Sequence, residues 1–512
     1  PSVADIARSQ ARERGSEDAL FFEGRRTTYA ELDALSSRCA AALIAAGVMP
    51  GERIAILSKS CDDFFILWFG AIKARACLAP VNWRLAPPEI AFIVKDCAAR
   101  LWFCDAAHAG VAAGLAAECP SIERFIQFEP GHPSWPGFRD WIVAHPAEDP
   151  HLPAHPDDAV IQLYTSGTTG LPKGVELTEA SYAAAFASAM EMWARFDPGD
   201  AVLVAMPLFH VAGANMGMLA LLQGAYAIIL READPGAIIS AIEAHAIGQA
   251  FLVPALINMI LAHPALATAD LSCLEKVYYG ASPISEAVLV EAQRRLGASF
   301  TQLYGLTETN GVGTFLSPQA HAEGRLRACG IASPGVEIRI LGEKGEAAPG
   351  QVGEIALRTK ALMKGYWRRP EATAEAIDQE GWFKSGDAGY FDEAGFLHIH
   401  DRVKDMIVSG GENVYPAEVE NALFSHPAVL DAAVIGAPDE RWGEAVMAVV
   451  VLRPGMSADP AALIAHCRER IAGYKCPKSV DFIDVLPRNP SGKVLRRQLR
   501  EPYWKGRDRQ VA

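Results

Sequence analysis

A glycine- and hydroxyl-rich loop with one lysine is the most informative chemical feature of the sequence. Residues 164–174 read Tyr-Thr-Ser-Gly-Thr-Thr-Gly-Leu-Pro-Lys-Gly. The glycines permit tight turns and close backbone approach, the hydroxyls supply hydrogen-bond donors, and the lysine supplies a point charge. These are the requirements of a phosphate cradle, although the spacing does not fit a Walker loop. Composition alone leaves a hydroxyl-rich turn between two strands equally open.

Further blocks along the chain also carry groups suited to nucleotide and acyl chemistry. They read Pro-Leu-Phe-His at 207–210, Tyr-Gly-Leu-Thr-Glu-Thr at 304–309, Trp-Phe-Lys-Ser-Gly-Asp at 382–387, Asp-Arg-Val-Lys-Asp at 401–405 followed by Ser-Gly-Gly-Glu-Asn at 409–413, and Pro-Arg-Asn-Pro-Ser-Gly-Lys at 487–493. In this order, and with the first loop, they resemble the adenylate-forming superfamily, which includes acyl-CoA synthetases, beetle luciferases and the adenylation domains of nonribosomal peptide synthetases. The resemblance covers essentially the whole chain.

The resemblance implies a binding site for the phosphates of ATP and for Mg²⁺. The phosphate loop would comprise Thr165, Ser166, Gly167, Thr168, Thr169 and Lys173. Thr307 would donate a hydrogen bond to the α-phosphate, and Glu308 is a hard oxygen ligand suited to Mg²⁺ that bridges ATP phosphates. Without the motif around it, Glu308 reads as an exposed loop carboxylate.

The resemblance also implies a site for adenosine. Tyr304 would offer a flat face to adenine, with Gly280 and Ala281 lining the other side. Asp387 would accept both ribose hydroxyls, and Arg402 would reach ribose or phosphate. The alternatives are a core aromatic for Tyr304 and surface ion pairs for the two charged residues.

Three further residues would govern the reaction and its two stages. Lys493 follows a flexible Ser-Gly turn and would deliver a mobile point charge to the reacting carboxylate and α-phosphate. Lys404 stands where the family has its interdomain hinge. His210 matches an aromatic position that resembles a gate between the acyl pocket and the thiol tunnel, while a satisfied core histidine is the alternative.

Coenzyme A would bind toward the C-terminus. Gly411 and Trp442 match positions that flank pantetheine and the CoA nucleotide, and Lys475 is an expected partner for a CoA phosphate. Residues 466–512 contain 12 Lys and Arg against 5 Asp and Glu, so this tail carries +7 within an acidic chain. A solvated surface is the alternative explanation for that charge.

Composition narrows the class of protein. The chain has 47 Lys and Arg against 61 Asp and Glu, a net charge of −14, which argues against a nucleic-acid partner because such binding needs clustered cations. The longest apolar run, Phe64 to Ile72, is far shorter than the roughly 20 residues of a membrane span, and the N-terminus lacks a secretory pattern. The ten cysteines show no metal-ligand spacing. We therefore expect reduced thiols, no transmembrane segment, no structural zinc and a cytoplasmic location.

The elements that must position these groups follow an alternating strand-helix pattern. Thr28 to Glu31 reads as a capping box before a helix that ends near Gly47. Strands are expected at 53–57, 77–81, 201–205, 227–230 and 276–279, and a helix at 61–75. Alternation of this kind predicts parallel sheets covered on both faces, while residues 130–156 read as a surface connection.

Short strands with tight turns replace this pattern after residue 336, which suggests a small barrel or sandwich over about 336–400. Helices at 417–424 and 461–470 then flank strands at 429–435 and 446–452, a compact α+β unit. The expected fold class is therefore α/β: a large N-terminal domain, residues 1–402, of doubly wound sheets plus a small β-barrel, and a small mobile α+β domain, residues 403–512.

The function these features imply is ATP-dependent ligation of a carboxylic acid to CoA through an acyl-adenylate, with release of AMP and pyrophosphate. The alternatives are an adenylation module that feeds a carrier protein, a luciferase-like oxygenase and a non-catalytic nucleotide-binding regulator. Free CoA is the expected acceptor because no carrier domain follows the last helix candidate. A homodimer is left open.

The identity of the acid is the least constrained part of this interpretation. The pocket candidates are Met216, Met218, Leu256, Met259, Val312 and Phe315. None is basic, so a second carboxylate would be left unpaired there, which argues against dicarboxylic acids. We expect a medium- or long-chain fatty acid, with an aryl or cyclic acid as the alternative.

Overall fold

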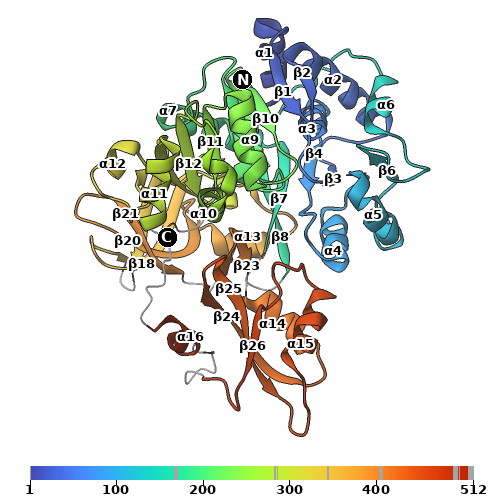
Figure 1. Cartoon of the computed structure of the whole chain (residues 1–512). Coiled ribbons are helices and arrows are strands. Elements are labelled where there is room, and N and C mark those ends of the chain that lie inside the picture. The colour runs from blue at the N-terminus through green and yellow to red at the C-terminus, as the bar shows by residue number, and fades with distance from the viewer. Residues whose placement is uncertain are drawn as a thin grey trace.

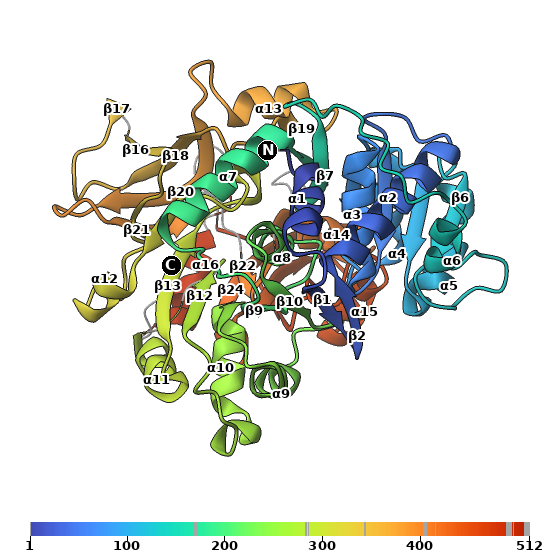
Figure 2. The same ribbon diagram turned by 90° about the horizontal axis from the view of Figure 1, so that it is seen from above.

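The computed structural model describes residues 2–166, 171–281, 284, 286–342, 345–402, 407–414, 416–487, 494 and 496–505. Two large sheets, a smaller antiparallel sheet and a C-terminal sheet account for the strands within these residues. Figure 2 shows the smaller antiparallel sheet on the opposite side of the molecule from α4, α5 and α6. The predicted α/β class, with a large N-terminal and a small C-terminal part, is confirmed.

The first large sheet has seven strands in the order β19-β8-β7-β4-β3-β5-β6. They are β3 (Arg53–Leu57), β4 (Cys77–Pro80), β5 (Leu101–Cys104), β6 (Arg124–Gln127), β7 (Ala159–Ser166), β8 (Pro172–Thr178) and β19 (Gly365–Tyr366). The strands from β7 to β6 are parallel, and β8 and β19 extend the sheet in antiparallel fashion. The expected strands at 53–57 and 77–81 are confirmed within one residue.

The second large sheet has nine strands in the order β15-β14-β13-β12-β11-β9-β10-β1-β2. They are β1 (Asp18–Phe22), β2 (Arg25–Thr28), β9 (Ala201–Val204), β10 (Tyr226–Ile229), β11 (Gln249–Leu252), β12 (Lys276–Gly280), β13 (Ser299–Tyr304), β14 (Thr314–Leu316) and β15 (Ile331–Ala332). Its six central strands, β13 to β1, are parallel. Both large sheets therefore direct the carboxyl ends of several parallel strands to one edge.

Helices cover the two large sheets. They are α1 (Ala4–Arg14), α2 (Tyr29–Ala45), α3 (Asp63–Lys73), α4 (Pro87–Cys97), α5 (Ala109–Leu115), α6 (Phe138–Val143), α7 (Glu179–Met192), α8 (Val211–Leu222), α9 (Pro235–His245), α10 (Pro254–Ala262), α11 (Glu286–Leu296), α12 (Pro318–Ala322) and α13 (Pro370–Ala376), with 3₁₀ turns η1 (Ala106–His108), η2 (Ala116–Glu118), η3 (Pro264–Ala267) and η4 (Thr307–Thr309). The capping box before α2 is confirmed, since Thr28 and Glu31 each bond the other's backbone N–H. Every residue of α3 is buried, which explains the longest apolar run of the sequence.

Residues 130–156 are more than a surface connection, so that expectation is wrong in part. The segment contains α6, whose Phe138 is fully buried and makes edge-to-face contacts with Phe103 and Phe128. This Pro- and His-rich segment therefore also carries a short apolar face, which packs against β5.

The expected barrel is an open sheet of five antiparallel strands in the order β17-β16-β18-β20-β21. The strands are β16 (Val336–Gly342), β17 (Gly345–Glu346), β18 (Gly353–Thr359), β20 (Phe383–Phe391) and β21 (Leu397–Arg402). The outer edge of β21 pairs through Leu397 with Gly330, beside β15, and not with β17. That edge is therefore already occupied within the described chain, and the sheet does not close.

The C-terminal part is the compact α+β unit that the sequence predicts. Its elements are β22 (Ile407–Ser409), β23 (Glu412–Val414), α14 (Pro416–Phe424), β24 (Val429–Asp439), β25 (Gly443–Leu452), α15 (Pro460–Arg468), β26 (Ser479–Phe482) and α16 (Arg496–Trp504). Side chains of α14 and α15 pack on one face of the sheet and those of α16 on the other. Figure 1 shows these helices on opposite sides of the sheet. Among the described residues, no helix is both long enough and apolar enough to cross a membrane.

Candidate active site

The carboxyl ends of the parallel strands meet at a cavity of about 730 Å³. It is lined by Thr165 and Lys173, His210, Gly280 and Ala281, Tyr304, Thr307 and Glu308, Asp387, Gly411 and Lys475, all of which were singled out from the sequence. Strands β4, β7, β9, β11, β12 and β13 deliver the loops around it. Ligands of open α/β sheets bind at this edge because the loops there converge.

One wall of the cavity carries the residues expected for adenosine. The Tyr304 hydroxyl donates to Asp387 Oδ2 at 2.9 Å, and the Asp387 backbone N–H donates to Ser385 Oγ at 3.0 Å. A methyl group on Gly280 would lie 2.1 Å from the Leu303 carbonyl oxygen, so only glycine fits there. The tyrosine and the aspartate that the sequence assigns to adenine and ribose are thus in direct contact.

A second wall carries the groups expected for the phosphates. The Tyr366 hydroxyl donates to Glu308 Oε1 at 2.8 Å, and the Lys173 ammonium lies 4.8 Å from the centre of the Tyr366 ring. Burial raises the pKa of the Glu308 carboxyl above its ordinary value, while its hydrogen bonds and Lys173 work in the opposite direction. Tyr366 had no sequence motif to mark it, and only its place on β19 beside β8 brings it here.

The residues on this wall are compatible with Mg²⁺, which the family implies. Magnesium in phosphate-transfer sites usually takes one or two carboxylates and completes its shell with phosphate oxygens and water. Glu308 supplies one such carboxylate, and a cation beside it would offset the cost of burying its charge. The described residues contain no group of three His, Cys, Asp or Glu side chains that could hold a metal by themselves.

A third wall joins the N-terminal and C-terminal parts. His210 Nε2 lies 3.3 Å from Glu412 Oε2, and the Arg84 guanidinium donates to the other oxygen of the same carboxylate. Burial favours a raised pKa for Glu412, but His210 and Arg84 outweigh it and the pKa falls below its ordinary value. The adjacent Gly411 has φ +83°, and a Cβ there would lie 3.2 Å from Val253.

Two of the expected CoA contacts are engaged within the protein in this arrangement. Lys475 is only 2% exposed, and its ammonium donates to Glu89 Oε1 at 2.8 Å and to Glu418 Oε1 at 2.5 Å. Trp442 is not among the residues that line the cavity and lies over Gly410, whose Cβ would come within 2.5 Å of the indole.

Several predicted site residues lie outside the described part of the chain. These are Gly167, Thr168, Thr169, Lys404 and Lys493. For Ser166 and Arg402 only the backbone is described, and Arg402 pairs with Asp387 across β20 and β21. Their roles remain predictions from the resemblance.

Sequence reasoning missed Arg84, Glu89 and the role of Glu412. Arg84 and Glu89 follow β4, so their place after a buried parallel strand was an available signal. Glu412 stood within a recognised motif, but nothing in the sequence identified which residue would face it.

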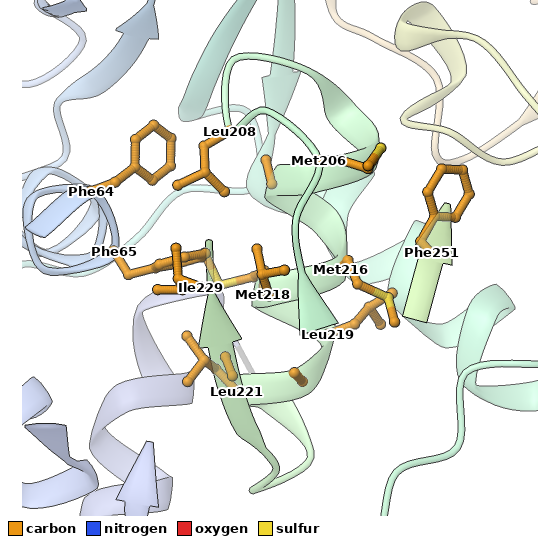
Figure 3. Close-up of a cluster of buried hydrophobic side chains, with 14 of the residues drawn as sticks. Phe64, Phe65, Met206, Leu208, Met216, Met218, Leu219, Leu221, Ile229 and Phe251 are labelled. Carbon is orange, nitrogen blue, oxygen red and sulfur yellow. The ribbon is translucent and has the colours of Figure 1, made fainter. Parts of the chain in front are cut away.

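The apolar end of the cavity differs from the expected pocket. Of the candidates, Leu256 and Met259 line it, together with Met206 and Val211, while Val312 and Phe315 do not. Figure 3 shows Met216 and Met218 inside the core, among side chains that include Phe65 and Phe251. Both methionines come from α8, which is buried along most of its length.

Comparison with known proteins identifies the family. Residues 7–367 match the family model of the AMP-binding enzyme and residues 418–493 match that of the AMP-binding enzyme C-terminal domain. The chain belongs to the AMP-binding enzyme family. It is 42% identical over 500 residues to the fatty acid–[acyl-carrier-protein] ligase ScoC of Streptomyces coeruleorubidus, covering 96% of this chain and 95% of that protein. It is 40% identical over 487 residues to feruloyl-CoA synthase of an Amycolatopsis species, covering 95% and 96%.

Solved structures share the fold over nearly the whole chain. The amide bond synthetase McbA of Marinactinospora thermotolerans superposes with a TM-score of 0.89 at 31% identity, covering 98% of this chain and 100% of that one. A double mutant of o-succinylbenzoate CoA synthetase of Bacillus subtilis, bound with its product analogue OSB-NCoA, gives 0.86 at 30% identity, covering 97% and 98%. ATP-bound MatB of Rhodopseudomonas palustris gives 0.72 at 30% identity, covering 98% and 99%.

Proposed function

We propose that the protein ligates a carboxylic acid to CoA in two steps at this cavity, through an acyl-adenylate. The observation that carries the proposal is that groups expected for adenosine, phosphate and thiol chemistry line one cavity. In the first step the carboxylate oxygen attacks the α-phosphorus of ATP and pyrophosphate leaves. In the second step the thiol sulfur attacks the acyl carbon and AMP leaves.

In the first step the chain acts through position and charge. Asp387 and Tyr304 would hold the nucleoside, while Thr165 and Lys173 would meet the phosphates. Glu308 would hold Mg²⁺, which when bound neutralises phosphate charge. Lys493 would contribute a further cation at the reacting carboxylate.

The domain arrangement of the structure is assigned to the second step. The turn between β22 and β23 places Gly411 on the cavity wall, next to Val253. At equal sequence identity, the TM-score is higher for the relative bound with a CoA-type product analogue than for the ATP-bound one, 0.86 against 0.72. A rotation about Lys404 would convert this arrangement to one in which Lys493 reaches the cavity.

The proposed acid is a medium- or long-chain fatty acid. The apolar residues at the end of the cavity include Leu256 and Met259, which would pack against an alkyl chain. An aryl acid is the second candidate, because the feruloyl-CoA synthase is nearly as similar to this chain as the fatty acid ligase.

The test is a screen of acids by AMP release that depends on both ATP and CoA. Saturated acids of increasing length should gain roughly three- to fourfold in kcat/KM per methylene, at about 0.8 kcal/mol for each buried CH₂, until the cavity is full. If kcat/KM does not rise with chain length among the fatty acids and is higher for ferulate or benzoate, an aryl acid replaces the fatty acid as the proposed substrate. Absence of acid-dependent pyrophosphate release from every acid would overturn the ligase proposal itself.

The acceptor is tested in the same assay by replacing CoA with an acyl carrier protein that bears phosphopantetheine. ScoC is named for such an acceptor, and this is the observation that favours the alternative. If the thioester forms faster on the carrier protein than on CoA at equal concentration, the carrier protein replaces CoA as the proposed acceptor.

A further inference from the structure

The segment of residues 82–89 connects the two parts of the protein through three polar side chains. Asn82 Nδ2 donates to the Tyr474 hydroxyl at 3.2 Å, Arg84 pairs with Glu412, and Glu89 accepts from Lys475 at 2.8 Å. In each pair the first residue follows β4 and the second belongs to the C-terminal part. These contacts exist only while the two parts keep this arrangement.

The Glu89–Lys475 pair is the most enclosed of the three. The Glu89 side chain is 10% exposed and that of Lys475 is 3% exposed. Lys475 also binds Glu418, which is 6% exposed and lies on α14 within the C-terminal part. The Lys475–Glu418 pair is therefore internal to that part, and Glu89 adds a second carboxylate from the N-terminal part.

We propose that Lys475 is a positioning residue for the thioester-forming step, which clamps the C-terminal part to Glu89 and does not bind a CoA phosphate. The inference rests on the proposed two-step function. When the parts separate for adenylation, Lys475 keeps Glu418 and loses Glu89. Closure therefore adds a charge-assisted hydrogen bond in a site with little solvent, where such bonds are strongest.

The charge state of the cluster agrees with this role. Burial alone would lower the pKa of the Lys475 ammonium, but Glu418 and Glu89 outweigh it and raise the pKa. The ammonium thus stays charged in its enclosed site, and the side chains of Glu89 and Glu418 already accept hydrogen bonds from it. A phosphate would have to displace at least one of them.

Glu89 also has a local structural role, which the test variant must preserve. Its Oε2 accepts the backbone N–H of Ala86 at 2.8 Å, which caps the first turn of α4. Glutamine serves equally well at this position of a capping box. Glu89→Gln therefore removes the charge that Lys475 requires while leaving the helix cap in place.

The experiment measures the two half-reactions of Glu89→Gln and Lys475→Met separately. Adenylation is followed by acid-dependent ATP–pyrophosphate exchange, and thioester formation by single turnover of supplied acyl-AMP with CoA. Both variants should lose about tenfold to a hundredfold in the thioester rate at saturating CoA, as for one charged hydrogen bond. Exchange should remain near that of the parent protein.

The competing role, in which Lys475 binds a CoA phosphate, predicts different changes in CoA binding. If Lys475 binds a CoA phosphate, Glu89→Gln should release it and tighten CoA binding, while Lys475→Met should weaken binding of CoA but not of pantetheine. Either result overturns the clamp. The clamp predicts that Lys475→Met lowers the thioester rate equally with CoA and with pantetheine. It also predicts that the double variant forms the thioester no more slowly than Lys475→Met alone.

Two further measurements keep the result interpretable. Glu118→Gln removes the charge of an exposed pair with Lys95 in the N-terminal part and should change neither half-reaction. If Lys475→Met loses both half-reactions, it has failed to fold, and Glu89→Gln then decides alone: an unchanged thioester rate in that variant overturns the clamp. Failure of the parent protein to release pyrophosphate with any acid would instead contradict the proposed function.

Discussion

The two ends of the cavity are built in different ways. At the end expected for ATP, the Tyr304 hydroxyl donates to Asp387 and the Tyr366 hydroxyl donates to Glu308, and all four residues belong to the N-terminal part. At the end expected for the thiol, Glu412 of the C-terminal part contacts Arg84 and His210 of the N-terminal part. The first set of contacts persists in any arrangement of the two parts, whereas the second depends on one arrangement. We therefore propose that the nucleotide site is preformed, whereas the acceptor site is assembled for only one step.

The largest expected effect is at the preformed end, from Glu308→Gln. Loss of this carboxylate removes the proposed Mg²⁺ ligand, and removal of one group that stabilises the transition state typically costs on the order of 10² to 10³ in rate. ATP–pyrophosphate exchange should fall by that amount, while turnover of supplied acyl-AMP with CoA should persist. Glu337→Gln, which breaks an exposed pair with Arg358, is the matched control. An equal fall in both half-reactions would remove the contrast between the two ends.

A smaller and opposite pattern is expected at the assembled end, from Glu412→Gln. The amide keeps the shape of the side chain but loses the charge that holds Arg84 and His210. Thioester formation should fall about tenfold, as for one charged hydrogen bond, with exchange unchanged. A variant that slows exchange more than thioester formation would show that this wall serves the nucleotide and not the acceptor.

Sequence reasoning was strongest where local rules decide the structure. Short strand-like runs in an alternating strand-helix pattern located β3, β9 and β12, and the Thr28 to Glu31 pattern located the start of α2. The adenosine wall was also within reach, because Tyr304 and Asp387 lie in recognised motifs and need only the fold to bring them together.

Sequence reasoning failed where a distant partner decides. The closure of the small sheet depends on whether β21 pairs with β17 or with Gly330, and strand patterns do not specify the partner at an edge. A basic residue in a basic tail reads as a phosphate ligand, yet Lys475 lies buried between two carboxylates. Similarly, the apolar pattern of α8 predicts burial but does not say whether a core or a ligand covers it.

The smallest effect is expected from pH, and it tests whether closure of the assembled end takes up a proton. Burial raises the pKa of Glu418 to about 8. Lys475 opposes this shift, and the nearby Glu89 adds to it. Separation of Glu89 removes the contribution of that carboxylate, so the pKa of Glu418 should be lower in the open arrangement than in the closed one. At a pH between the pKa values of Glu418 in the two arrangements, the closed arrangement holds more protons than the open one, so rising pH weakens closure.

The thioester rate relative to exchange should then fall a few-fold from pH 6.5 to 8.5. Glu418→Gln should abolish that slope, whereas a slope that persists in this variant would place the titrating group elsewhere.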